Sequence, residues 1–92
     1  MTRVDALNMP VEMISLCDDG GKLRPLRFRY QDAAQQMVVV RVEEVVYQKE
    51  SQQAGLAACL FVCRAQLGER QRVFELRYAV REHRWTLFRF LS

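Results

Sequence analysis

Hydrophobic and polar residues alternate along several short segments of this chain. In Leu26–Tyr30, three apolar side chains alternate with two arginines, and in Phe74–Tyr78 three apolar side chains alternate with a glutamate and an arginine. Met37–Tyr47 is dense in β-branched residues, which disfavour helix. A period of two is typical of a β-strand with one buried face. The patterning therefore predicts a chain made mainly of strands.

The remaining segments extend this prediction to six strands. The predicted strands are Val11–Cys17, Leu26–Tyr30, Met37–Tyr47, Ala57–Gln66, Arg72–Val80 and Trp85–Phe90. The doubled Glu43–Glu44 shifts the alternation by one residue and predicts a β-bulge or a sharp bend. Residues 54–67 also show apolar side chains three and four apart, so a helix is an open alternative there.

Segments rich in polar residues and glycine separate the predicted strands. Tight connections are predicted at Asp18–Gly21, Leu67–Arg70 and Arg81–Arg84, and a polar connection is predicted at Gln31–Gln36. Gln48–Gly55 is predicted to be the longest loop, and loops of this kind often carry function. We expect residues 1–9 to be a flexible tail and residues 10–92 to form a single β domain.

Short strands with turns about every ten residues are typical of small all-β folds. We expect an antiparallel six-stranded meander that curls into a small barrel or a strongly bent sheet. The 92 residues suffice for one core, and half of them are hydrophobic.

Composition points to a reduced, aqueous compartment. The longest apolar runs stop at strand length, well short of the roughly 18 to 20 residues that span a bilayer. The start of the chain lacks the features of a signal peptide, and an odd count of three cysteines argues for free thiols. We therefore expect a cytoplasmic protein without membrane contact. The net charge of +3 is too mild to indicate nucleic-acid binding by itself.

None of the reactive residues has the spacing of a catalytic or metal site. Cys59 and Cys63 would lie roughly 13 Å apart on a strand, too far for one metal ion. His83, the only histidine, falls in a predicted turn. Asp18–Asp19 and Glu43–Glu44 are adjacent carboxylates, which point to opposite sides of an extended chain. We expect no enzyme activity, no metal and no cofactor.

Arginines and aromatic residues supply the candidate binding residues. If the aromatic side chains point inward, Arg27, Arg29 and Arg77 project from the outside of the sheet. They could then meet phosphates or carboxylates, or they could pair with Glu12, Glu43 and Glu75 across strands. The phenylalanines are expected in the core rather than on a base-stacking platform. The candidate binding residues are Arg27, Arg29, Tyr47, Arg64, Arg77 and Trp85.

Some apolar residues fall on the side of a strand that should face solvent. They are Val39, Val46, Leu60 and Val62. A strand that is apolar on both faces commonly buries its second face against another chain. The sequence therefore predicts a homodimer.

Three segments carry a resemblance to a known family. The run Arg24–Tyr30, the later strand Phe74–Tyr78 and the closing Trp85–Leu87 resemble small bacterial SH3-like or Sm-like β-barrels. They are most similar to the WYL domain, although Thr86 stands where that family has tyrosine. The resemblance implies a regulatory or nucleic-acid-sensing module in which Arg27, Arg29 and Arg77 would be the positions to test.

The leading hypothesis is a non-enzymatic interaction or regulatory module, homodimeric, with a protein partner that the sequence does not identify. The alternative hypothesis is binding of single-stranded nucleic acid through an arginine-rich sheet face.

Overall fold

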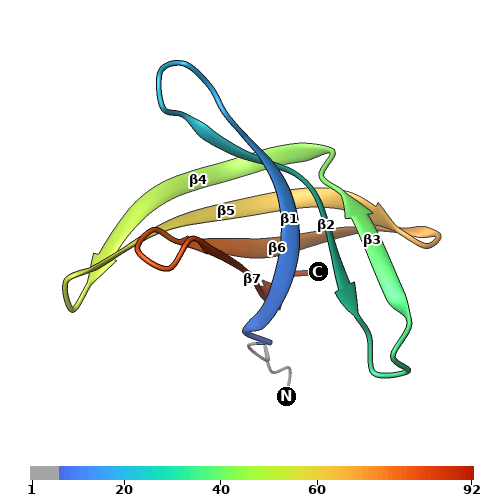
Figure 1. The fold of residues 1–92 in the computed structure, drawn as a ribbon. Helices are drawn as coiled ribbons and strands as arrows, with labels where there is room; N and C mark the ends of the chain where they lie inside the picture. The colour runs from blue at the N-terminus through green and yellow to red at the C-terminus, as the bar shows by residue number, and fades with distance from the viewer. Residues whose placement is uncertain (1–6) are drawn as a thin grey trace.

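A computed structural model describes residues 7–92, apart from the side chain of Gln53. In this part of the chain one antiparallel sheet curls into a half-barrel (Figure 1). The strands are β1 (Met9–Cys17), β2 (Leu23–Gln31), β3 (Met37–Arg41), β4 (Glu44–Gln53), β5 (Leu56–Leu67), β6 (Arg70–Ala79) and β7 (Arg84–Phe90). Their order across the sheet is β3-β2-β1-β7-β6-β5-β4. The all-β prediction is confirmed, with seven strands rather than six.

The additional strand arises because the predicted strand Met37–Tyr47 is two strands. The amide of Val42 donates to the carbonyl oxygen of Leu26 in β2 (2.9 Å), whereas the next amide, that of Glu43, donates to Arg64 in β5 (3.0 Å). The chain thus passes at Val42–Glu43 from one edge of the sheet to the other. The bend predicted from the doubled glutamates lies one residue earlier than expected and ends β3.

The prediction of a long loop at Gln48–Gly55 is wrong. β4 continues to Gln53 and pairs with β5 in register, from Gln48 opposite Phe61 to Gln53 opposite Leu56. Only Ala54 and Gly55 remain as the turn, and both have a positive φ (52° and 77°). A polar sequence is tolerated here because β4 pairs on one edge only and its side chains from Gln48 to Glu50 are exposed. The same pairing excludes the helical alternative for residues 54–67.

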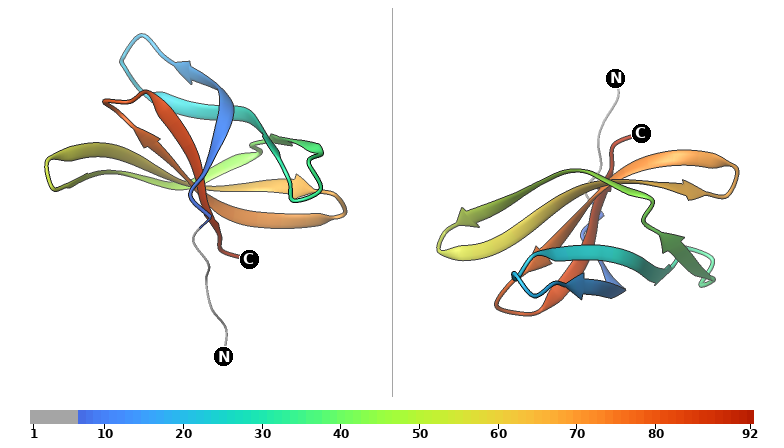
Figure 2. Two further views of the ribbon diagram at one scale, coloured as in Figure 1. Left: turned by 60° about the horizontal axis from the view of Figure 1, so that its bottom comes forward. Right: turned by 90° about the horizontal axis from the view of Figure 1, so that it is seen from above.

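The curled sheet forms two layers that enclose the core. β1, β2 and β3 cross over strands β4 to β7, so that the inner faces of the two layers meet (Figures 1 and 2). β1 links the layers, because Met9–Val11 pairs with β7 and Glu12–Cys17 pairs with β2. The buried apolar residues are Phe28, Val40, Phe61, Cys63, Ala65, Phe74, Leu76, Trp85 and Leu87.

The hairpin turns follow the chemistry expected of them. Asp18 Oδ1 accepts hydrogen bonds from the amides of Gly20 (2.9 Å) and Lys22 (2.8 Å), and Gly21 takes a positive φ of 85°. Most of the predicted N-terminal tail, residues 1–6, lies outside the described residues. Within residues 7–92 there is no helix long and apolar enough to cross a membrane.

Candidate functional site

The structure divides the candidate binding residues among three places. Because the inner faces of the two layers meet, their outer faces point away from each other (Figure 2). Arg27 and Arg29 lie on the outer face of β1–β3, Tyr47, Arg64 and Arg77 lie on the outer face of β4–β7, and Trp85 lies in the core. The arginines therefore project as expected, but from opposite sides of the domain.

Trp85 is a core residue. Its side chain is 7% exposed, and its ring lies 5.3 Å from that of Phe61 and 5.0 Å from that of Tyr78. The phenylalanines Phe28, Phe61 and Phe74 are buried as predicted. A base-stacking surface built on these rings is therefore absent.

The outer face of β4–β7 mixes apolar and basic side chains. Val62 lies opposite Tyr47 on one side and Glu75 on the other, and Leu60 lies opposite Lys49 and Arg77. Residues directly opposite each other in an antiparallel pair share a face, so the strand register brings these side chains together. We call this surface the β4–β7 face; its members are Glu44, Tyr47, Lys49, Leu60, Val62, Arg64, Glu75, Arg77, Phe88 and Arg89.

Glu75 organises two arginines at the centre of the β4–β7 face. Its two carboxylate oxygens accept hydrogen bonds from Nε of Arg77 and Nε of Arg89, each at 3.1 Å. The residue is only 5% exposed, although it lies on the outside of the sheet. The guanidinium carbon of Arg77 lies 3.4 Å from the ring centroid of Phe88, and that of Arg89 lies 5.5 Å from it. Both arginines are thus fixed by a carboxylate and an aromatic ring while remaining about 40% exposed.

The alternation of polar and apolar residues did not predict that Phe88 and Arg89 lie on the same face. Strict alternation places neighbouring residues on opposite faces, and Phe88 was expected in the core. The pairing of β6 with β7 shifts by one residue, because Glu75 lies opposite Arg89 while Leu76 lies opposite Leu87. This bulge brings the half-buried Phe88 and its neighbour Arg89 to the same face. The adjacent apolar residues Leu87 and Phe88, which shift the alternation by one residue, are the local signal that could have indicated it.

Two of the three glutamates expected to pair with arginine do so. Glu75 holds Arg77 and Arg89, and Glu12 accepts two hydrogen bonds from Arg29, at 3.0 and 3.1 Å. The hydrogen bond and the charge of Arg29 lower the pKa of Glu12. Glu43 instead accepts hydrogen bonds from the amide of Gln66 and the side chain of Gln71, and Glu44 forms the ion pair with Arg64.

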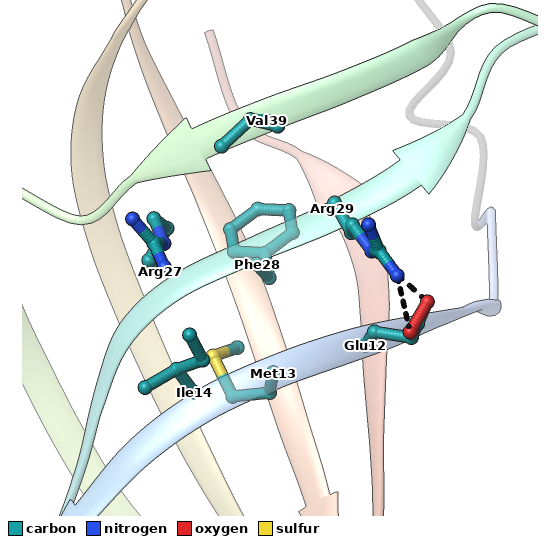
Figure 3. A pocket seen from close by; sticks show the side chains of 7 residues that line it. All are labelled: Glu12, Met13, Ile14, Arg27, Phe28, Arg29 and Val39. Atoms are coloured by element: carbon teal, nitrogen blue, oxygen red, sulfur yellow. Dashed lines mark hydrogen bonds and ion pairs between the residues drawn. The ribbon is translucent and has the colours of Figure 1, made fainter.

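The outer face of β1–β3 carries a different arrangement. Arg27 in β2 lies opposite Ile14 in β1 and opposite Arg41 in β3. A shallow depression beside Arg27 and Arg29 is bordered by Ile14 and Val39, which are 53% and 60% exposed (Figure 3).

The thiols and the histidine lie outside both faces. Cys63 is fully buried, and burial raises the pKa of its thiol to about 12. Burial also raises the pKa of Cys59. His83 is exposed in the turn before β7, with its Nδ1 3.0 Å from the hydroxyl of Tyr78. Among residues 7–92, no three histidine, cysteine or acidic side chains gather closely enough to hold a metal ion.

No protein-family model matches the chain, and no curated protein and no solved structure is detectably similar to it. The resemblance to WYL and SH3-like domains stays a prediction. The geometry of the two outer faces is what bears on function.

Proposed function

We propose that this domain is an interaction module that binds a partner protein through the β4–β7 face. The observation that carries this proposal is the cluster in which Glu75 and Phe88 together hold Arg77 and Arg89. The partner is an acidic surface that also presents apolar side chains.

The cluster has the features of a preorganised contact surface. Arginine and tyrosine are enriched among the residues that dominate protein interfaces. An arginine already held by an aromatic ring and a carboxylate loses less side-chain entropy when a partner binds. The exposed ring of Tyr47 and the half-buried Leu60 and Val62 supply apolar area beside the arginines. The face thus combines a fixed polar centre with an apolar surround.

Charge on this face favours an acidic partner. The four basic members are Lys49, Arg64, Arg77 and Arg89, and the two acidic members are Glu44 and Glu75. This leaves a net charge of +2. Both acidic residues are already engaged by arginines, so the outermost groups of the face are cationic. Complementary charge steers encounter and suppresses wrong partners.

The homodimer and the nucleic-acid hypothesis fit this geometry less well. Of the four outward apolar residues, Leu60 and Val62 lie on the β4–β7 face and Val46 lies at the bulge in β4, whereas Val39 lies on β3, on the opposite side of the domain. Pairing the β4–β7 face with its own copy would also bring two positive faces together. The arginines expected on a single nucleic-acid face are divided between opposite sides of the domain.

Selection from a random peptide library tests the proposal even though the partner is unidentified. Peptides selected on the wild-type domain should be rich in Asp and Glu next to aromatic or aliphatic residues. They should bind Arg77→Ala at least about tenfold more weakly, the effect of losing a central interface arginine. Arg77→Lys should also weaken binding, because lysine keeps the charge but lacks the planar guanidinium group that stacks on Phe88 and donates from Nε to Glu75.

Arg27→Ala is the matched control, since it removes one arginine from the opposite outer face. It should leave peptide binding unchanged, and circular dichroism should show that all variants are folded. Neutral or basic selected peptides, or affinities that do not change in Arg77→Ala, would refute the proposal. Sedimentation of the domain alone as a dimer that Arg77→Ala dissociates would identify a second copy as the occupant instead, and would equally refute it.

A further inference from the structure

We infer that Arg27 and Arg41 form a binding site for a phosphate-type oxyanion on the outer face of β1–β3. This site is separate from the β4–β7 face and does not depend on the function proposed for that face.

The first observation is the direct opposition of two like charges. Arg27 and Arg41 are paired residues of β2 and β3, so their side chains leave the sheet on the same side with Cβ atoms about 5 Å apart. Like charges in this position destabilise a sheet. Among residues 7–92, no carboxylate lies within 4 Å of either guanidinium group. Within this part of the chain, the pair therefore lacks a carboxylate such as Glu75, which partly balances the charges of Arg77 and Arg89.

The second observation is that the backbone holds both residues in place. Arg27 lies in the middle strand of its layer and is paired on both sides, with Ile14 and with Arg41. Just after Arg41, the amide of Val42 donates to the carbonyl oxygen of Leu26 (2.9 Å) and fastens the end of β3 to β2. The two arginines cannot separate by moving the strands apart. Each guanidinium group still moves on its flexible, exposed side chain, and an anion bound between the two groups would relieve their repulsion directly.

The surroundings suit an anion with several oxygens. The depression beside Arg27 is bordered by the apolar side chains of Ile14 and Val39 (Figure 3), and Arg41 lies two residues beyond Val39 on the same side of β3. Arg29, the next outward residue of β2, is held by Glu12 and leaves Arg27 as the open donor. Guanidinium forks match phosphate oxygens in pairs, and a phosphate has enough oxygens to accept from both arginines.

Thermal unfolding with and without pyrophosphate tests this inference. At constant ionic strength, pyrophosphate should raise the midpoint by about 6–11 °C once its concentration is about ten times Kd. Arg27→Gln and Arg41→Gln should each abolish most of this shift. Arg70→Gln removes an exposed arginine at the start of β6 and should retain the shift, which controls for net charge.

A second measurement distinguishes a lost site from a damaged fold. In chloride alone, Arg41→Gln should be at least as stable as the wild type, because it removes a like-charge contact. A less stable Arg41→Gln would contradict the repulsion on which the inference rests. So would an equal pyrophosphate shift in the wild type and both variants.

A binding experiment with oligonucleotides distinguishes a phosphodiester backbone from a small free phosphate as the natural ligand. Fluorescence anisotropy with single-stranded dT oligomers at low salt should show binding that depends on Arg27 and Arg41 if the natural ligand is a phosphodiester backbone. Pyrophosphate binding without oligonucleotide binding would identify a small free phosphate. Binding of neither ligand would overturn the inference and leave the proposal for the β4–β7 face untouched.

Discussion

The outward arginines of the two layers of this half-barrel differ in their partners. On β4–β7, Glu75 accepts from both Arg77 and Arg89, and Phe88 packs beneath their guanidinium groups. On β1–β3, Arg27 faces Arg41 directly with no carboxylate partner among the described residues. The first group of arginines is fixed and its charge is partly balanced, whereas the second group has two like charges at paired positions.

This difference shows that a count of surface arginines says little about their role. A fixed arginine with its charge partly balanced suits a broad contact with another protein, where rigidity lowers the cost of binding. An unbalanced pair suits a compact anion that both residues reach at once. The layers also differ in what they bury, since most of the core residues come from β5, β6 and β7.

The largest effect should come from breaking the contact between the two layers. Phe74 of β6 is fully buried, and its ring lies 5.6 Å from that of Phe28 in β2 in an edge-on arrangement. Phe74→Ala should lower the free energy of unfolding by about 3–5 kcal/mol, measured by urea titration. Val39→Ala, on the exposed side of β3, should change it by less than about 0.5 kcal/mol. Comparable losses in both variants would mean that the core is not shared between the layers.

A second effect on the free energy of unfolding should appear at alkaline pH and arises from Cys63 in β5. The pKa of the Cys63 thiol is raised to about 12 in the folded chain, above the ordinary value of 9.0. The folded state therefore favours the protonated thiol, and this stabilisation is complete below pH 9 and is lost as the pH rises toward 12. The loss has a limiting slope of about 1.4 kcal/mol per pH unit. In urea titrations from pH 8 to 10.5, the free energy of unfolding should decline more steeply with pH for the wild type than for Cys63→Ala. Parallel pH dependences in the two proteins would contradict this prediction.

Replacing the glutamates of the two outer faces should have smaller effects on the free energy of unfolding, and the two effects should differ. Glu75→Gln leaves two arginines without their carboxylate and should cost about 1–2 kcal/mol, less than a fully buried pair because both arginines are partly exposed. Glu12→Gln, whose side chain is 67% exposed, should cause no measurable change. Thermal unfolding of the two variants at neutral pH makes this comparison. A larger loss in Glu12→Gln would reverse our description of the two faces.

Local features of the fold were predictable because their causes are local. The alternation in Leu26–Tyr30 and Phe74–Tyr78 marked both segments as strands and placed their arginines outside, as the structure shows. The Asp18–Gly21 turn followed from side chains that bond to their own backbone. The all-β class follows from the sum of such segments.

Only the tertiary structure decided which strands meet and which side chains share a face. The polar segment after Tyr47 became a strand because β5 supplies its hydrogen bonds, and Val42–Glu43 divided a strand because each amide found a different partner. The shift between β6 and β7 brought Phe88 and Arg89 to one face, and the curling of the sheet sent Arg27 and Arg77 to opposite sides. A period of two specifies the two sides of a strand, but pairing between distant segments determines what each side contacts.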